Sequence, residues 1–250
     1  MEFDLVFFLI AGPAVIFAGV SKAGFGSGAA FAASSILVLV LEPGQALGIM
    51  LPLLMLVDVA SLRPYWKKWD PKHAMLLVLG SLPGVALGAL LYKGADADVL
   101  RVLIGLLSLA FVIWQVGRAQ GWIKTAERAM PHWAGYLAGA VAGFTSFVSH
   151  AGGPPAAVYL LSQRPSKTQY QATTVLVFWV INIAKAVPYS FLGIFTAQTL
   201  LADVLLAPFA LLGAYLGVRA HYLIPERAFF ALTYVLLVLT GTKLIWDGLF

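Results

Sequence analysis

Long apolar runs alternate with short polar connections along the whole chain. Runs of roughly 17–25 apolar residues are long enough to cross a bilayer as helices. The pattern predicts about ten helical segments, near 4–20, 26–41, 44–62, 73–92, 98–117, 132–149, 153–163, 169–192, 198–218 and 227–246. The second and seventh segments are short for a full span, which normally takes about 20 residues.

Composition decides the class of protein. Of the 250 residues, 61% are hydrophobic and only 11% are charged, and the mean hydropathy is +0.90. Because so few charges cannot cover a water-soluble surface, we expect an all-α polytopic membrane protein in a lipid bilayer, with a single transmembrane domain over 1–250. The acidic start MEFD has no basic n-region of a signal peptide, so the first apolar run is expected to be retained.

The charged loops predict which side each connection faces. The loops 63–73 and 118–131 are basic, whereas 93–98 is net acidic. Lys and Arg concentrate in the cytoplasmic loops of helical membrane proteins, so the first two are predicted inside and the third outside. The same bias accounts for the formal charge of +5 without nucleic acid as a partner.

Two parts of the chain resemble each other. The segment LPGVALGALLY (82–92) can be laid over APFALLGAYLG (207–217), with a proline and a glycine matching. This is a weak internal repeat of about 125 residues, the size of a transporter half-domain. The predicted halves are about 1–125 and 126–250.

The loop charges predict that the halves are inverted. The basic loop 63–73 corresponds to 192–198, which has no charge, and the acidic loop 93–98 corresponds to the basic region 219–227. Five segments per half, an odd number, predict the same inversion. Both termini are then expected outside.

Two glycine-rich motifs interrupt the apolar segments. They read GVSKAGFGSG (19–28) and GFTSFVSHAGGPPAA (143–157), and each holds one ionisable residue, Lys22 or His150. Pro154 fits the first turn of a new helix but not a helix interior. We therefore expect broken or re-entrant helices whose freed N–H groups form an anion site, as in inverted-repeat transporters.

Purely structural roles would also fit these residues. Glycines in membrane helices are often close-packing positions, and Lys22 could snorkel to an interface if the first two segments span fully. His150 is either a hydrogen-bonded structural histidine or a proton-coupling group.

Lys185 lies in an apolar run, 171–193, that has no other charge. A lysine deep in a membrane helix counts as a functional hypothesis by default. Asn182 lies three residues earlier on the same helical face. Asp58 is the candidate counter-charge, although it is only five residues before Arg63 and so has an interfacial alternative. More buried cations than anions predict an anionic substrate.

These motifs resemble the sulfite exporter TauE/SafE family, also called the 4-toluene sulfonate uptake permease family. The resemblance rests on GVSKAGFGSGAAF (19–31), LEPGQALGIMLPLLMLVD (41–58) and GFTSFVSHAGGPPAAVYLL (143–161), and it extends over the whole chain. It implies a permease of the bacterial cell inner membrane for small sulfur-containing anions such as sulfite, thiosulfate or organosulfonates. It does not fix which anion or which direction.

The motif residues carry over as candidate substrate-binding positions. The first motif supplies Lys22, Gly24, Gly26 and Ser27, the second supplies Ser149, His150, Gly152, Gly153 and Pro154, and Asn182 and Lys185 complete the candidate site. His150 and Asp58 are the candidates for coupling to H⁺.

The favoured function is a secondary transporter that works by alternating access, and the alternative is an anion channel on similar broken helices. No GxxxxGK[ST] loop for ATP and no GxSxG nucleophile is present, and the four histidines lack metal-ligand spacing. We therefore expect no enzyme activity, no cofactor and no metal. The oligomeric state stays open.

Overall fold

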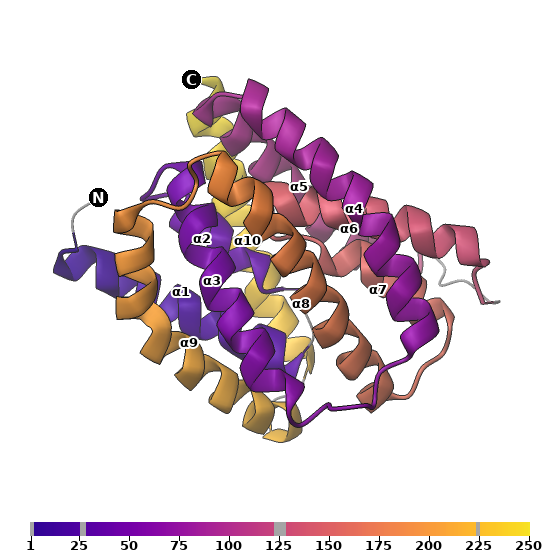
Figure 1. Ribbon diagram of the computed structural model, residues 1–250. Helices are drawn as coiled ribbons and strands as arrows, with labels where there is room; N and C mark the ends of the chain where they lie inside the picture. The colour runs from indigo at the N-terminus through magenta and orange to yellow at the C-terminus, as the bar shows by residue number, and fades with distance from the viewer. Residues whose placement is uncertain (1–2, 26–28, 123–128, 224–225) are drawn as a thin grey trace.

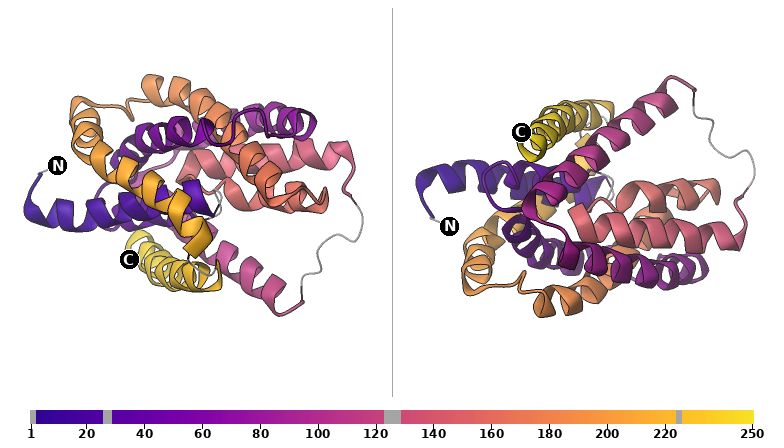
Figure 2. Two further views of the ribbon diagram at one scale, coloured as in Figure 1. Left: turned by 90° about the horizontal axis from the view of Figure 1, so that it is seen from below. Right: turned by 90° about the horizontal axis from the view of Figure 1, so that it is seen from above.

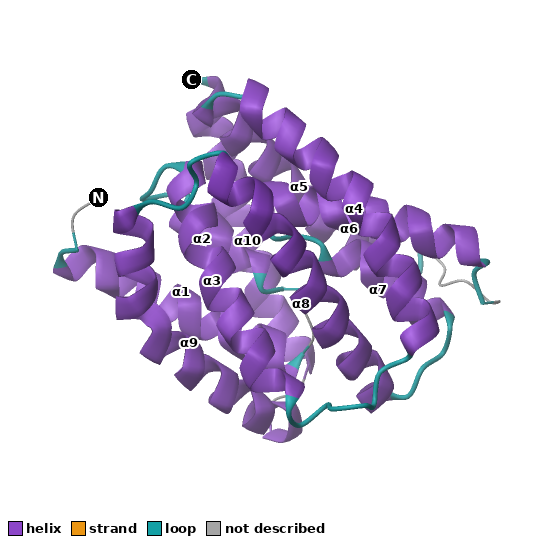
Figure 3. Cartoon of the chain, in the orientation of Figure 1, coloured by secondary structure: helices purple, strands orange, loops and turns teal. Residues whose placement is uncertain are grey.

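The computed structural model describes residues 3–25, 29–122, 129–223 and 226–250 (Figure 1). Within these residues the chain forms ten α-helices and no strand (Figure 3). The helices are α1 (Leu5–Gly24), α2 (Phe31–Leu37), α3 (Pro43–Leu62), α4 (Pro71–Gly94), α5 (Ala97–Ala119), α6 (His132–Ser149), α7 (Gly153–Ser162), α8 (Lys167–Phe191), α9 (Ala197–Leu223) and α10 (Glu226–Leu249). The all-α prediction is confirmed.

Two predicted boundaries in the first glycine motif were wrong. Helix α1 continues through Lys22 to Gly24, and the Phe25 N–H still donates to the Ser21 carbonyl at 2.9 Å. Among the described residues of the predicted segment 26–41, the α-helix covers Phe31–Leu37. Lys22 therefore belongs to the end of a helix rather than to the loop that follows it.

Short polar side chains define where the long helices begin. Asp4, Asp70 and Asp96 accept backbone N–H bonds from Phe7, His73 and Val99 at 2.8, 3.1 and 2.8 Å. Ser166 does the same at the start of α8. Each satisfies an N–H that has no partner inside its own helix.

The start of α4 is also tied to α8. The Asp70 N–H donates to Thr173 Oγ1 at 2.9 Å, and His73 Nδ1 lies 2.8 Å from Asp70 Oδ2. Partial burial favours the protonated carboxyl, but the hydrogen bonds from His73 outweigh it and keep the pKa of Asp70 below its ordinary value.

Seven of the described helices are long and apolar enough to cross a membrane, namely α1, α3, α4, α5, α8, α9 and α10. Large apolar side chains cover their outer surfaces, among them Leu90, Ile113 and Val204, which are 69–70% exposed. Such surfaces suit lipid rather than water. The chain is therefore a multi-pass membrane protein.

Glycines let pairs of long helices cross closely. A Cβ added at Gly84 of α4 would meet the Ala140 carbonyl of α6, and one added at Gly213 of α9 would meet the Ile16 carbonyl of α1 at 2.5 Å. Contacts this short exclude any side chain, so these glycines serve backbone-to-backbone packing. The α4–α6 and α1–α9 pairs are among the most closely packed in the bundle.

Both short helices run back beside the helix that precedes them. The Met130 N–H, just before α6, donates to Ser162 Oγ at the end of α7 at 3.3 Å. Residues 38–41, just after α2, line the same cleft as Phe7 at the start of α1. Figure 2 shows the N-terminus and the α8–α9 connection at one end of the bundle, and the α5 end and α6 start at the other. Helices α1 and α6 therefore begin at opposite ends of the bundle.

Candidate functional site

The first polar cluster joins α1, α3 and α8 inside the apolar bundle. Lys22 Nζ lies 2.7 Å from Asp58 Oδ2 and donates to the Leu54 carbonyl at 3.2 Å. Asn182 Nδ2 donates to the same Asp58 oxygen at 2.9 Å. All three side chains of this cluster are at most 3% exposed. A hydrogen-bonded ion pair of this kind is the form in which opposite charges tolerate burial.

This cluster bears on two sequence expectations. Lys22 does not snorkel to an interface, because its ammonium group is turned to Asp58. Asp58 is the counter-charge that the sequence suggested, and its side chain is fully buried. Among the described residues its second oxygen, Oδ1, has no hydrogen-bond partner. A buried carboxylate oxygen without a partner is costly, so it is a point where a proton or a ligand group would be stabilised.

The second polar cluster joins α6 and α8. Lys185 Nζ lies 2.8 Å from His150 Nδ1 and donates to the Ser146 carbonyl at 3.0 Å. His150 Nε2 lies 3.4 Å from the Leu47 carbonyl of α3. A protonated lysine can only donate, so Nδ1 accepts and Nε2 carries the hydrogen of a neutral imidazole. No carboxylate contacts this lysine among the described residues.

The break after α6 holds His150 in place. His150 has φ 58° and ψ 15°, the left-handed conformation that ends the helix. Thr145 Oγ1 donates across the break to the Ala151 carbonyl at 3.1 Å. Helix α7 then begins at Gly153 with Pro154 in its first turn, as the sequence predicted.

A small cavity lies between the two clusters. It is lined by Lys22, Ala30, Leu54, Ser146, His150, Phe178 and Asn182, and its volume is about 10 Å³. That is room for about one water molecule. Side chains from both glycine motifs and from α8 therefore meet at one point, but a sulfite-sized anion enters only if they move apart.

Other predicted residues lie elsewhere. A Cβ at Gly24 would meet the Gly217 carbonyl of α9, so Gly24 is a close-packing glycine. Ser149 Oγ donates to the Thr145 carbonyl of its own helix at 3.2 Å. Gly152 backs onto the Ala142 carbonyl and Phe178, and Gly153 is the first residue of α7. None of these four lines the small cavity. Gly26 and Ser27 lie outside the described residues.

Sequence reasoning missed several neighbours of the clusters. Ser146 lines the cavity, and its backbone carbonyl accepts from Lys185 at 3.0 Å. Ser146 was detectable, because it lies one helical turn before His150. The Leu54 and Leu47 carbonyls were not, since every residue carries such a group.

The described residues contain no group of three or more His, Asp or Glu side chains that could hold a metal ion. The clusters instead present ammonium, amide and imidazole groups around one carboxylate. Amine and amide N–H groups are hydrogen-bond donors, which suits an anion with several acceptor oxygens.

Comparisons with known proteins give one clear result. Neither a search of curated proteins nor a search of solved structures yields a match. The family model described as sulfite exporter TauE/SafE matches residues 11–244, nearly the whole chain and both polar clusters. The chain therefore belongs to the sulfite exporter TauE/SafE family of membrane transporters.

Proposed function

We propose that the chain is a secondary transporter that carries a small sulfur-containing anion, such as sulfite, thiosulfate or an organosulfonate, across the bacterial inner membrane. The observation that carries the proposal is the balance of charge in the two polar clusters, to which Asp203, the other buried carboxylate of the described residues, makes no hydrogen bond. Two lysines, Lys22 and Lys185, share a single carboxylate, Asp58, beside a polar cavity. An uncompensated charge in a membrane interior is costly, so an entering anion supplies what the second lysine lacks.

Alternating access is supported by the tightness of the centre. A cavity of about 10 Å³ cannot hold an anion of four or more heavy atoms. Binding therefore requires α1, α6 or α8 to shift, and a site that opens only by such shifts is what alternating access needs.

An inverted repeat of about 1–125 and 126–250 is supported by the matched packing of the two halves. Helix α1 packs on α9 as α6 packs on α4, and α3 and α8 pack on each other. Lys22 meets a residue 36 positions later, and His150 meets one 35 positions later. We propose that α1–α2 and α6–α7 are the corresponding broken helices, with α2 and α7 re-entrant.

Proton coupling is the finer part of the proposal. His150 can take up a proton at Nδ1 only when Lys185 no longer donates to it, as when an anion draws the ammonium group away, whereas Asp58 has one oxygen without a described partner. Both groups are therefore candidates for proton uptake. Protonating either group changes the net charge beside the anion by one. Uptake or release of the anion would then be linked to pH.

The direct test is counterflow in proteoliposomes. We expect vesicles preloaded with one unlabelled anion to take up the labelled form transiently, tested in turn with sulfite, thiosulfate, sulfoacetate and sulfate. Lys22→Met should abolish this uptake, whereas the matched control Lys93→Met changes an exposed lysine outside the site and should keep it. Counterflow requires a carrier, so dissipative flux without it would favour the channel. Folded protein that exchanges none of these anions would refute the substrate class.

A further inference from the structure

A cleft of about 470 Å³ opens at the end of the bundle where α5 ends and α8 begins. Its polar lining includes Gln115 and Arg118 from α5, and Lys167, Tyr170 and Gln171 from α8. It thus has two cationic side chains, and no carboxylate is among its described lining residues. By the loop charges this end is the predicted cytoplasmic face.

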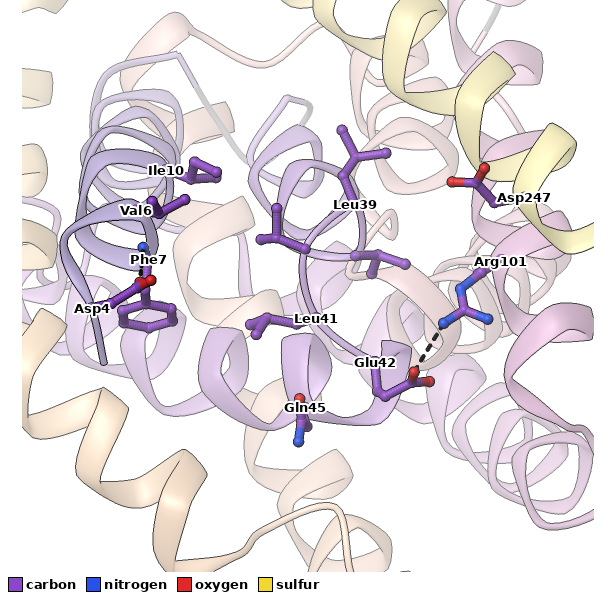
Figure 4. Close-up of a pocket in the computed structure, with 12 residues that line it drawn as sticks. Asp4, Val6, Phe7, Ile10, Leu39, Leu41, Glu42, Gln45, Arg101 and Asp247 are labelled. Atoms are coloured by element: carbon purple, nitrogen blue, oxygen red, sulfur yellow. Dashed lines mark hydrogen bonds and ion pairs between the residues drawn. The ribbon is translucent and has the colours of Figure 1, made fainter. Parts of the chain in front are cut away.

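The cleft at the opposite end has the reverse charge. Its volume is about 740 Å³, and Asp4, Glu42 and Asp247 line it together with a single cation, Arg101 (Figure 4). Arg101 pairs with Glu42 at 3.1 Å and with Asp98 at 2.6 Å, and Asp247 pairs with Lys243, so carboxylates still outnumber cations around this cleft. An anion is therefore attracted at one end of the bundle and repelled at the other.

Helix stability does not account for both cations of the first cleft. Arg118 lies in the last turn of α5, where a cation favours the helix dipole, and it stacks over Trp114 at 5.0 Å. Lys167, however, is the first residue of α8, where the dipole disfavours a positive charge. Lys167 therefore adds a second positive charge to the lining, although its place in the helix does not favour one.

The cleft borders the central clusters directly. Gln171, which lines the cleft, donates to the Lys22 carbonyl at 3.0 Å. Gly24, two residues beyond Lys22, and Pro154, four residues beyond His150, line it as well. The cleft and the central cavity are therefore lined by neighbouring residues of α1 and of the α6–α7 region.

We propose that this cleft is the vestibule that captures the anion on the cytoplasmic face, with Arg118 and Lys167 as its recruiting residues. The proposal rests on the proposed transport function and extends it, because it names the site and the residues that first meet the anion. The acidic cleft at the other end disfavours an anion instead.

The first test measures the local charge and needs no transport. The chain has no cysteine, so Leu161→Cys in the vestibule and Leu39→Cys in the acidic cleft each provide one thiol, at sites 40% and 38% exposed. Each is reacted with a methanethiosulfonate carrying an ethylsulfonate and with one carrying a trimethylammonium group. The ratio of the anionic to the cationic rate should be roughly tenfold higher at Leu161→Cys.

Matched variants test whether the two cations cause the higher ratio at Leu161→Cys. In that background, Arg118→Gln with Lys167→Gln should lower the ratio of the anionic to the cationic rate to its value at Leu39→Cys. Lys68→Gln with Lys72→Gln removes the same charge from the same face outside the cleft, and should leave the ratio unchanged. The vestibule proposal would be overturned by equal rate ratios at the two thiols. It would also be overturned if the control pair lowered the ratio at Leu161→Cys as much as Arg118→Gln with Lys167→Gln does.

The second test measures sided flux of labelled sulfite in everted and right-side-out vesicles. The Arg118→Gln, Lys167→Gln variant should raise KM roughly tenfold from the cytoplasmic side at low salt, with kcat and the exterior KM unchanged. An unchanged cytoplasmic KM, or an equal rise on both sides, would overturn the proposal. A wild-type chain that moves no anion would instead refute the proposed function. The rate ratios at the two thiols would still test the vestibule proposal, because they do not depend on transport.

Discussion

The two polar clusters, which the proposed repeat places in corresponding positions, differ in chemistry. In the first, Lys22 is neutralised by Asp58, and Asn182 donates to the same oxygen. In the second, Lys185 meets His150 and a backbone carbonyl, with no carboxylate among its described contacts. One buried amine is thus charge-compensated within the protein and the other is not.

This difference indicates that the two proposed half-sites have different roles. A compensated pair is stable with or without substrate, so the first cluster is suited to holding α1 against α3. An uncompensated amine beside an imidazole is sensitive to any anion or proton that arrives. The second cluster is therefore the part expected to respond to substrate and pH.

The comparison between the two clusters depends on the proposed inverted repeat. The test of that repeat has the largest expected effect, because each introduced cysteine should be labelled either completely or not at all. Ala95 lies in the α4–α5 connection, and Gln198 lies in the first turn of α9, next to the α8–α9 connection. Gln198 belongs to the segment 192–198 that corresponds to the basic loop 63–73, so in inverted halves it faces the exterior, as Ala95 does, and Lys72 faces the cytoplasm. An impermeant maleimide added to intact cells should label both Ala95→Cys and Gln198→Cys completely, and a thiol introduced at Lys72→Cys not at all. Labelling of only one of the first two positions would remove the basis for the comparison.

The next largest effect is that of Lys22→Met on stability. It leaves Asp58 buried without its partner, which typically costs about 3–5 kcal/mol, and we expect the thermal unfolding midpoint in detergent to fall accordingly. Adding Asp58→Asn removes the stranded charge and should restore most of the stability, but not sulfite counterflow. If the double variant stays as unstable as the single one, the ion pair does not have the stabilising role given to it.

Lys185→Met should reduce stability less than Lys22→Met does, and should reduce transport as much. It strands no carboxylate, and the lost hydrogen bonds to His150 and Ser146 cost about 2 kcal/mol. Sulfite counterflow should be lost because the uncompensated charge is gone. A stability loss larger than that of Lys22→Met would reverse the comparison between the clusters.

His150→Gln separates proton response from binding. Glutamine keeps a hydrogen-bonding group near Lys185 but does not titrate, so the flux should lose its pH dependence while part of its rate remains. The same pH series with Asp58→Asn shows whether the first cluster contributes. A profile unchanged by His150→Gln would remove the proton role from the second cluster.

The sequence predicted the helices well because hydropathy and helix caps are local. All ten predicted segments have a counterpart in the described helices, and the break at His150 follows from Pro154 and the glycines before it. The buried lysines could also be predicted, since a charge in the middle of a membrane span is too costly to be there by chance.

What the sequence could not provide was the pairing of these charges. That Asn182 reaches Asp58 on another helix, rather than Lys185 on its own, depends on how α3 and α8 cross. The role of Gly24 in packing also depends on an approach of α9 that no local pattern shows. Glycines for a close helix crossing and glycines for a ligand read alike in a sequence.

The smallest expected effect concerns the link between the clusters. Asn182 and Lys185 lie on the same helix, and Asn182 alone of the two bonds directly to Asp58. Asn182→Ala removes one donor while the ion pair remains, so stability should fall by only about 1 kcal/mol. A double-mutant cycle with Lys185→Met, read from unfolding midpoints and from the KM for sulfite, measures whether the two clusters act together. Additive effects on both quantities would mean that each half-site works alone. A coupling in KM without one in stability would mean that the clusters are joined through the bound anion, as a site shared between two halves requires.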